Sequence, residues 1–223
     1  MSVEFQDTPY AWQVITHLGS LGLMIPVVAI AATSLWQAGQ KAAVRIWLPA
    51  LALAATITLA TKILFLGWGI GIAALDFTGI SGHTLLATSV LPVLFGSLFA
   101  QDRYCAKPAG AAFGLLIGAV VGISRIFLGA HSGSEVVVAW LIGAAVSGVT
   151  LKALDSSLQR LWLAWLAPLV LFLAFNAATS SYLQAHNWEV RIALLLSGHD
   201  RPYTRHQLMA NMNRPVFLGG SSL

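Results

Sequence analysis

The stretch FTGISGHTLLATSVLPVLFGSLFAQ, residues 77–101, contains no Asp, Glu, Lys or Arg. Its 25 residues exceed the ~20 apolar residues that a transmembrane helix needs. Segments 8–40 and 161–188 are equally free of these four residue types. All three are rich in Ala, Leu and Gly and do not alternate between apolar and polar residues, which argues against membrane strands. The pattern predicts helices that cross a bilayer.

The composition of the whole 223-residue chain supports the same class. Only 9% of its residues are charged and 57% are hydrophobic, whereas about 25% are charged in soluble globular proteins. So few charges cannot cover the surface of a soluble fold, and the same count excludes disorder, collagen and a nucleic-acid-binding domain. A single cysteine, Cys105, excludes an intramolecular disulfide and a cysteine-rich metal site. We therefore expect an integral membrane protein with no nucleic-acid partner.

Three shorter charge-free segments, of 16 or 17 residues, reach the length of a span if the charged residues beside them lie at or just inside the membrane. Those charged residues are Lys62, Arg125 and Glu135. The sequence then predicts six transmembrane helices, at 14–36, 44–66, 81–100, 109–128, 134–153 and 161–183. The predicted fold is an all-α polytopic membrane helix bundle, with one membrane domain over 1–185 and a short polar or interfacial tail over 186–223.

The direction of successive spans brings the polar positions of this bundle together. Because neighbouring helices cross in opposite directions, the second helix ends, the third begins, the fourth ends and the fifth begins at one membrane face. These places carry Lys62, the tripeptide Ser81-Gly82-His83, Arg125 with His131, and Glu135. Ionisable groups at membrane depth are costly and usually functional. We therefore predict a functional site at this face.

The basic residues predict which side of the membrane the site faces. The opposite loops carry three pairs of basic residues, namely Lys41 and Arg45, Arg103 and Lys107, and Lys152 and Arg160. Loops rich in basic residues stay in the cytoplasm, so we expect the site on the periplasmic or extracellular face of a cell membrane. The tail carries four arginines on the site's side, but the three short loops agree with one another. The compact six-span form points to a bacterial inner membrane.

The clustered residue types suit either a metal ion or an anion. Two histidines and a carboxylate could hold zinc, but the neighbouring Lys62 and Arg125 would repel it. Two cations beside a Ser-Gly pair at a helix start favour an oxyanion, because free backbone N–H groups there bind phosphate. Glu135 lies four residues after His131. That spacing lets the carboxylate accept a hydrogen bond from one ring nitrogen and leaves the other free to attack.

The fourth and fifth predicted helices are joined by a motif that resembles a known family. Ser124-Arg125, five residues, His131, three residues and Glu135 is similar to the third signature of the type 2 phosphatidic-acid phosphatase superfamily, which also includes vanadium haloperoxidases. That signature reads Ser-Arg, five residues, His, three residues, Asp. The chain keeps the carboxylate, on a longer side chain.

Two upstream motifs resemble the same family in the right order. Ile80-Ser81-Gly82-His83 resembles its second signature, Pro-Ser-Gly-His, and Lys62 resembles the Lys that opens the first signature, Lys, six residues, Arg-Pro. Ser-Gly-His recurs at 197–199, so the spacing of the motifs carries the resemblance. The Arg-Pro pair is absent, because the chain has Gly69 and Ile70 there. We expect a tail arginine that precedes proline to supply the missing cation, either Arg201 or Arg214.

The resemblance implies a phosphoric-ester or diphosphate hydrolase that needs no metal and no cofactor. His131 would attack phosphorus, Glu135 would orient His131, and His83 would protonate the leaving group and then activate water. The substrate phosphate would be bound by Lys62, Ser81, Gly82 and Arg125. The implied partner is a membrane lipid such as undecaprenyl diphosphate, phosphatidylglycerol phosphate, phosphatidic acid or a lipid A phosphate.

Two other functions fit the same residues. A lipid-to-lipid phosphotransferase would pass the phosphoryl group from His131 to a second lipid instead of to water. A non-catalytic binder or transporter of anionic lipids would have lost turnover together with the first-signature arginine. Tracing labelled phosphate separates the hydrolase from the transferase. Lipid binding that survives His131→Ala, without turnover in the wild type, would identify the binder.

Overall fold

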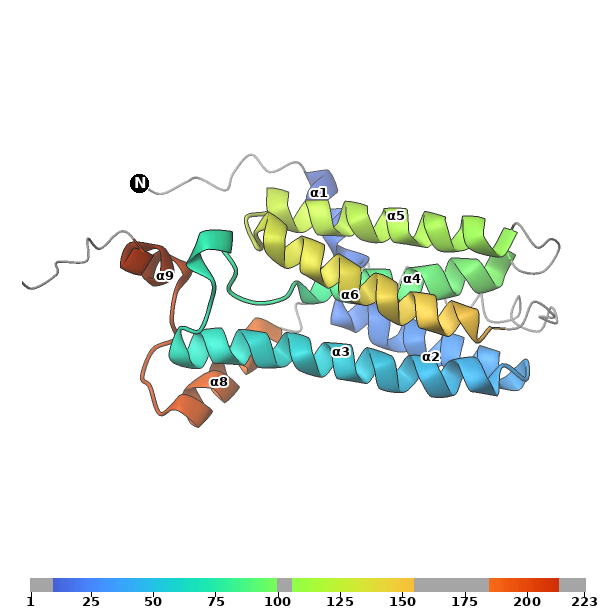
Figure 1. The fold of residues 1–223 in the computed structure, drawn as a ribbon, viewed down its shortest axis with the longest axis horizontal. Coiled ribbons are helices and arrows are strands. Elements are labelled where there is room, and N and C mark those ends of the chain that lie inside the picture. The colour runs from blue at the N-terminus through green and yellow to red at the C-terminus, as the bar shows by residue number, and fades with distance from the viewer. Residues whose placement is uncertain (1–9, 100–105, 155–184, 213–223) are drawn as a thin grey trace, which may run out of the picture.

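A computed structural model describes residues 10–99, 106–154 and 185–212 of the chain. Its helices (Figure 1) are α1 (Tyr10–His17), α2 (Leu21–Gln37), α3 (Lys41–Trp68), the 3₁₀ turn η2 (Ala73–Leu75), α4 (Gly82–Phe99), α5 (Ala106–Phe127), α6 (Gly133–Lys152), α8 (Ala185–Ser197) and α9 (Arg205–Met212). Within these ranges the chain forms no strand beyond one isolated bridge between Ile72 and Phe77. The all-α prediction is confirmed.

Four stretches of helix in the described ranges are long and apolar enough to cross a membrane, and one more is apolar but shorter. They are Tyr10–Gln37, Lys41–Trp68, Lys107–Phe127 and Gly133–Lys152, with Gly82–Leu98 as the shorter one. These stretches coincide with the first five predicted spans, and the protein is a multi-pass membrane protein. The sixth predicted span, 161–183, lies outside the described residues.

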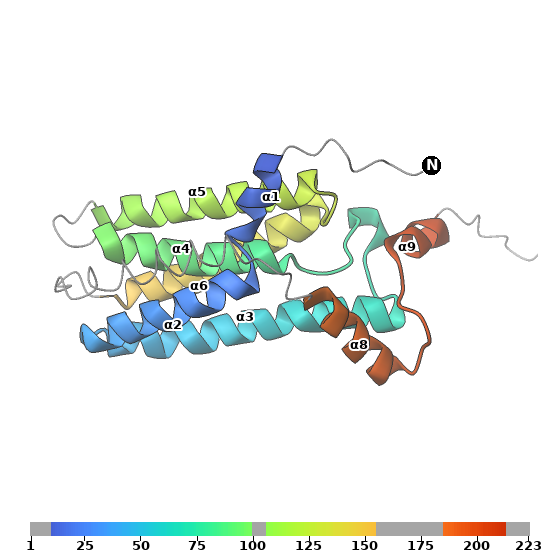
Figure 2. The same cartoon turned by 180° about the vertical axis from the view of Figure 1, so that it is seen from behind.

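The first predicted span is divided by a tight contact with another helix. α1 ends at His17, α2 begins at Leu21, and Gly19 lies between them against the start of α4. A Cβ atom at Gly19 would lie 2.5 Å from the carbonyl oxygen of His83, so only glycine permits this approach. The break turns α1 across the end of α5 (Figure 2), where Trp12 stacks on Phe127.

α4 is the buried helix at the centre of the bundle. It packs against α2, α5 and α6, and its residues Val90 and Val93 are fully buried. Helix α5 approaches through glycine, since a Cβ at Gly118 would lie 2.4 Å from Cγ2 of Thr88. Small residues let membrane helices come this close. This approach packs α4 closely against α5.

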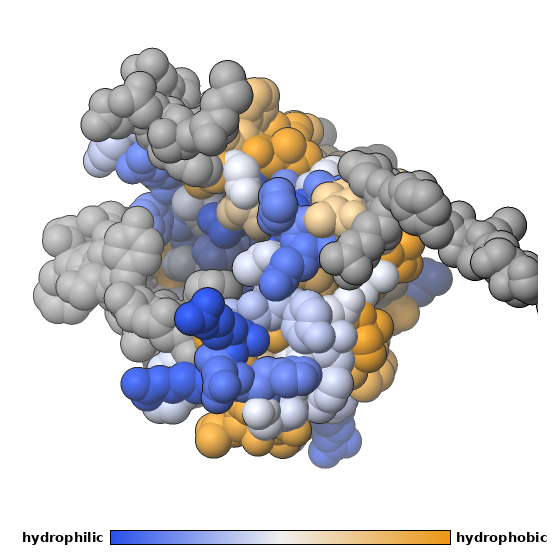
Figure 3. All heavy atoms as spheres, turned by 90° about the vertical axis from the view of Figure 1, so that its left-hand side faces the viewer, coloured by the Kyte–Doolittle hydropathy of each residue, from blue (hydrophilic) through white to orange (hydrophobic). Residues whose placement is uncertain are grey.

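The predicted site residues lie at one end of the bundle. α3 and α5 end there, and α4 and α6 begin there (Figure 1). Seen face-on, hydrophilic side chains gather over this end, with apolar side chains around its edge (Figure 3). The 28 residues of α3 extend about 42 Å, longer than the ~30 Å hydrocarbon core. The turns of α3 after Lys62 therefore extend toward the water, together with η2 and α9.

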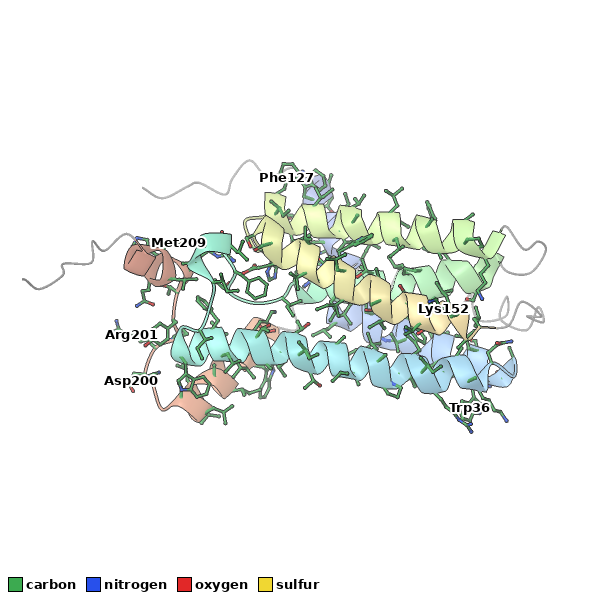
Figure 4. All side chains as sticks on the ribbon, in the orientation of Figure 1. Trp36, Phe127, Lys152, Asp200, Arg201 and Met209 are labelled. Carbon is green, nitrogen blue, oxygen red and sulfur yellow. The ribbon has the colours of Figure 1, made fainter. Side chains whose placement is uncertain are left out.

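The end of the bundle opposite the site carries basic residues from which the orientation in the membrane was predicted. Lys41 and Arg45 lie over the ring of Trp36, with distances of 5.7 and 5.6 Å to the ring centroid. Trp36 and Lys152 mark this end, whereas Asp200 and Arg201 lie at the site end (Figure 4). A tryptophan beside two cations suits the interface between membrane and water.

Candidate active site

Helix α6 begins with a capping box that places Glu135. The side chain of Ser132 accepts a hydrogen bond from the N–H of Glu135, and the Glu135 carboxylate accepts one from the N–H of Ser132. This reciprocal pair satisfies two backbone groups at the helix start. It also turns the Glu135 side chain back toward the loop that carries His131. The sequence Ser-Gly-Ser-Glu at 132–135 is typical of a capping box. The family motif does not specify the capping Ser132.

The Glu135 carboxylate is fully buried and holds groups from several parts of the chain. Its Oε2 lies 2.7 Å from Nδ1 of His131. Its Oε1 accepts hydrogen bonds of 2.6 Å from both the backbone N–H and the hydroxyl of Thr78. Nη2 of Arg205 lies 2.9 Å from Oε1 and 3.0 Å from Oε2. These donors compensate the burial of a charged carboxylate, which would otherwise be costly.

His131 is held in one tautomer by this carboxylate. Because Glu135 can only accept, Nδ1 carries the proton and Nε2 keeps its lone pair. The side chain is only 12% exposed. Burial lowers the pKa of His131 below its ordinary 6.5, and the charges of Lys62 and Arg125 act in the same direction, while Glu135 opposes them. The ring is therefore neutral near pH 7, with Nε2 available as a nucleophile.

The tripeptide at 81–83 forms the start of α4. The N–H of Ser81 donates to the carbonyl oxygen of Glu135 over 3.4 Å, which ties this helix start to α6. The first hydrogen bond of the helix runs from the N–H of Leu85 to the carbonyl oxygen of Ser81, so the N–H groups of residues 82–84 have no partner within the helix. Such groups at a helix start can bind an anion. Ser81 itself is fully buried, and its hydroxyl lies 2.9 Å from that of Thr84.

Two cations approach from neighbouring helices. Arg125, in the last turn of α5, donates from Nη1 to the hydroxyl of Thr16 over 2.9 Å. Its Nε is buried and has no hydrogen-bond partner in the described part of the chain. Lys62, near the end of α3, forms a 2.8 Å ion pair with Glu189 of α8. A bound oxyanion would supply the acceptor that Nε of Arg125 lacks.

The structure brings all the residues that the sequence nominated to the same end of the bundle. Lys62, Arg125 and His131 lie close enough to His83 to act on it electrostatically. The nominated set comes from four helix ends and the loop before α6: Lys62, Ser81, Gly82, His83, Arg125, His131 and Glu135. Their catalytic and phosphate-binding roles remain predictions.

A second arginine, which the motifs did not indicate, contacts Glu135 at this site. Arg205, the first residue of α9, contacts Glu135 and Thr78 and forms a 2.7 Å ion pair with Asp76. Arg201 is exposed and forms none of these contacts, and Arg214 lies outside the described residues. Because Arg205 is not followed by proline, a search for a displaced Arg-Pro pair could not find it.

The second Ser-Gly-His sequence, at 197–199, attaches the tail to α3. Nδ1 of His199 lies 2.7 Å from the carbonyl oxygen of Gly67, which is near the end of α3. The His199 ring also packs edge-on against Tyr203, with centroids 5.8 Å apart. The histidine thus caps a helix end by binding one of its last carbonyl groups.

Comparison with known proteins supports the resemblance that the motifs carry. The family model of the PAP2 superfamily matches residues 22–159. A relative from Klebsiella pneumoniae, called "Uncharacterized 22.5 kDa protein in cps region", is 30% identical over 213 residues, which cover 88% of this chain and 97% of the relative. No solved structure matches the chain significantly. The family prediction is confirmed: the chain is a multi-pass membrane protein of the PAP2 superfamily.

Proposed function

We propose that the protein is a membrane lipid phosphatase that forms a phosphohistidine intermediate on His131. Members of the PAP2 superfamily are generally phosphatases, and the apolar helices favour a substrate in the bilayer. The observation that carries the proposal is the 2.7 Å contact between Nδ1 of His131 and the buried Glu135. This contact leaves Nε2 unprotonated, on a ring that lies close enough to Lys62 and Arg125 to feel their charges.

In the first step, Nε2 of His131 forms a bond to phosphorus and the bond from phosphorus to the leaving oxygen breaks. Glu135 stabilises the positive charge that develops on the imidazole. Arg125, Lys62 and the N–H groups at the start of α4 stabilise the charge on the non-bridging oxygens. His83, protonated in the presence of the substrate dianion, donates its proton to the leaving oxygen.

In the second step, a water molecule attacks the phosphorus atom of the phosphohistidine. The bond between phosphorus and Nε2 breaks, and the water proton passes to His83, which restores the proton that it gave up. Inorganic phosphate leaves, and His131 returns to its neutral form. Water therefore supplies the oxygen of the released phosphate.

The position of the site favours a phosphate on a lipid. It lies where several apolar helices end, so a head group at the membrane surface can enter while its chains stay in the leaflet. Undecaprenyl diphosphate, phosphatidylglycerol phosphate, phosphatidic acid and a lipid A phosphate are the candidate substrates. The basic residues at the opposite end, Lys41, Arg45 and Lys152 among them, favour a site on the outer side of a bacterial inner membrane.

The proposal is tested by phosphate release from this lipid panel, using purified wild type and His131→Ala in detergent with EDTA. We expect release by the wild type only, and ³²P on the protein after acid-free quenching of the wild type only. Transfer of label to a second lipid would replace the hydrolase with a phosphotransferase. Lipid binding by both proteins without any turnover would identify a binder or transporter.

Sidedness is tested with single cysteines in a Cys105→Ser background. Asp200→Cys at the site end and Gln37→Cys at the opposite end are both exposed positions. In intact spheroplasts, a membrane-impermeant maleimide should label Asp200→Cys and should label Gln37→Cys only after lysis. The reverse pattern would place the site in the cytoplasm.

A further inference from the structure

We infer that Arg205, on the tail helix α9, is a positioning residue for the nucleophile His131 and acts through Glu135. This inference rests on the proposed function and adds to it a residue that none of the family motifs contains. Arg205 lies 70 positions after Glu135 in the sequence and reaches the carboxylate from the water side of the bundle.

The contacts of the guanidinium define what it does. Nη2 lies 2.9 and 3.0 Å from the two oxygens of Glu135 and 3.1 Å from the hydroxyl of Thr78. Nη1 lies 2.7 Å from Oδ2 of Asp76. Arg205 therefore bridges two carboxylates, and its planar, permanently charged group can hold both at once.

Glu135 depends on this bridge because of where it lies. Its carboxylate is fully buried, and among the described residues its other donors are His131, Thr78 and the N–H of Ser132. None of these donors is a permanent cation, so Arg205 supplies the counter-charge. Removing one partner of a buried ion pair leaves an uncompensated charge, which is strongly unfavourable. Without Arg205, we expect the carboxylate to move toward water and to release Nδ1 of His131.

The loop at Asp76 is shaped for the same contact. Asp76 has φ 49° and ψ 41°, the left-handed region that non-glycine residues rarely adopt. Strained backbone of this kind persists only where surrounding contacts hold it. Here the loop brings Asp76 to Nη1 of Arg205 and Thr78 to Nη2, so that a single guanidinium fixes the η2 loop and the Glu135 carboxylate relative to each other.

The tail that carries Arg205 is attached at several points. Thr204 and Gln207 form reciprocal side-chain to backbone hydrogen bonds at the start of α9, which fixes the first turn. The N–H of Tyr203 donates to the carbonyl oxygen of Leu66 over 2.9 Å. The ring of Tyr203 covers Gly69, where a Cβ would lie 2.8 Å from Cδ1 of the ring. These contacts set the position of the guanidinium from the end of α3.

The geometry separates positioning from phosphate binding. The donors of Arg205 point to Glu135, Thr78 and Asp76, whereas an arginine that replaced the missing first-signature residue would join the cations around His83. A positioning residue affects the rate of the chemical step, and a phosphate-binding residue affects the affinity for substrate and for inorganic phosphate. The two roles therefore give opposite kinetic patterns.

The test compares Arg205→Ala and Arg205→Lys with the matched control Arg191→Ala, an exposed arginine of α8. For Arg205→Ala we expect kcat to fall roughly 100-fold, with KM and the inhibition constant of inorganic phosphate within about twofold of wild type. Arg205→Lys should recover part of kcat, and added guanidinium ion should partly rescue Arg205→Ala. Arg191→Ala should match the wild type. An unchanged kcat, or a tenfold rise in both KM and the inhibition constant of phosphate at constant kcat, would overturn the inference.

A second measurement does not depend on turnover and distinguishes failure of the inference from failure of the proposed function. The ¹⁵N chemical shifts of His131 report which ring nitrogen carries the proton. We expect the Nδ1-protonated tautomer in the wild type and in Arg191→Ala, and a mixture of tautomers in Arg205→Ala. If Arg205→Ala kept the wild-type tautomer, Arg205 would have no positioning role. If the wild type released phosphate from none of the lipids, only the proposed function would be contradicted, because the tautomer of His131 would still report on Arg205.

Discussion

Lys62 and Glu189 lie 127 positions apart in the sequence, and Nζ of Lys62 lies 2.8 Å from Oε1 of Glu189. The two side chains are 22% and 16% exposed, so the pair lies at the boundary between the bundle and the water. Lys62 is a predicted phosphate ligand, and in this structure a carboxylate of α8 already neutralises it. A substrate phosphate and Glu189 must therefore share the same ammonium group.

This sharing predicts that Glu189→Gln binds lipid phosphates more tightly. Loss of the competing carboxylate should lower KM about threefold, in the range of a partly exposed ion pair, and leave kcat nearly unchanged. Steady-state kinetics at two ionic strengths would measure the effect, and Asp200→Asn, an exposed neutralisation nearby, is the control. A tenfold higher KM would mean instead that Glu189 holds Lys62 in its binding position.

The lowered pKa of His131 predicts the acid side of the pH profile. Burial favours neutral His131, so the nucleophile stays active as pH falls to 6.5 and is lost only below it. The unfolded chain takes up this proton first, so the contribution of His131 to stability also decreases as pH falls below 6.5. The profile of kcat/KM against pH checks the first statement. An acid limb at or above 6.5 would be inconsistent with a buried His131.

The contacts of Glu135 predict a graded loss of activity at this position. Glu135→Gln keeps the size but removes the charge that fixes the His131 tautomer, so kcat should fall about 10³- to 10⁴-fold. Glu135→Asp keeps the charge but is one methylene too short to reach Ser132, Thr78 and His131 together, so kcat should fall about tenfold. Single-turnover rates would rank the two variants. An Asp variant as impaired as Gln would show that reach matters as much as charge.

Substitution by alanine at two glycines of α6 should affect stability differently. A Cβ at Gly143 would lie 1.8 Å from the hydroxyl of Thr88, so Gly143→Ala should overpack the contact with α4 and cost about 1–3 kcal/mol. Nothing lies within 4 Å of a Cβ at Gly148, so Gly148→Ala should be neutral or slightly stabilising. Thermal unfolding in detergent compares the pair. Equal midpoints for both variants would mean that α6 can shift away from α4.

The fold class and the location of the site could be predicted because both depend on simple patterns. Charge-free runs of 16 residues or more indicate the spanning helices of the described residues. Alternating directions then place Lys62, His83, Arg125 and Glu135 at one end without any knowledge of packing. The contact between His131 and Glu135 follows from a spacing of four residues.

Arg205 shows what such patterns do not reach. The family signature pointed to Arg-Pro pairs, and hence to Arg201, which does not contact Glu135, and to Arg214, which lies outside the described residues. Arg205 contacts Glu135 because the cap at Thr204 and the contact of Tyr203 with α3 fix the start of α9. No periodicity or motif encodes that distance.

The sequence by itself therefore determined the membrane class, the first five spanning helices and the set of chemical groups at one end of the bundle, since each depends on local hydrophobicity or short spacing. Only the tertiary structure decided which partners those groups have: Thr16 for Arg125, Glu189 for Lys62, and Thr78 and Arg205 for Glu135. These partners are between 57 and 127 positions away. Contacts over such separations arise from the way helices and tail pack, and packing is a property of the whole chain.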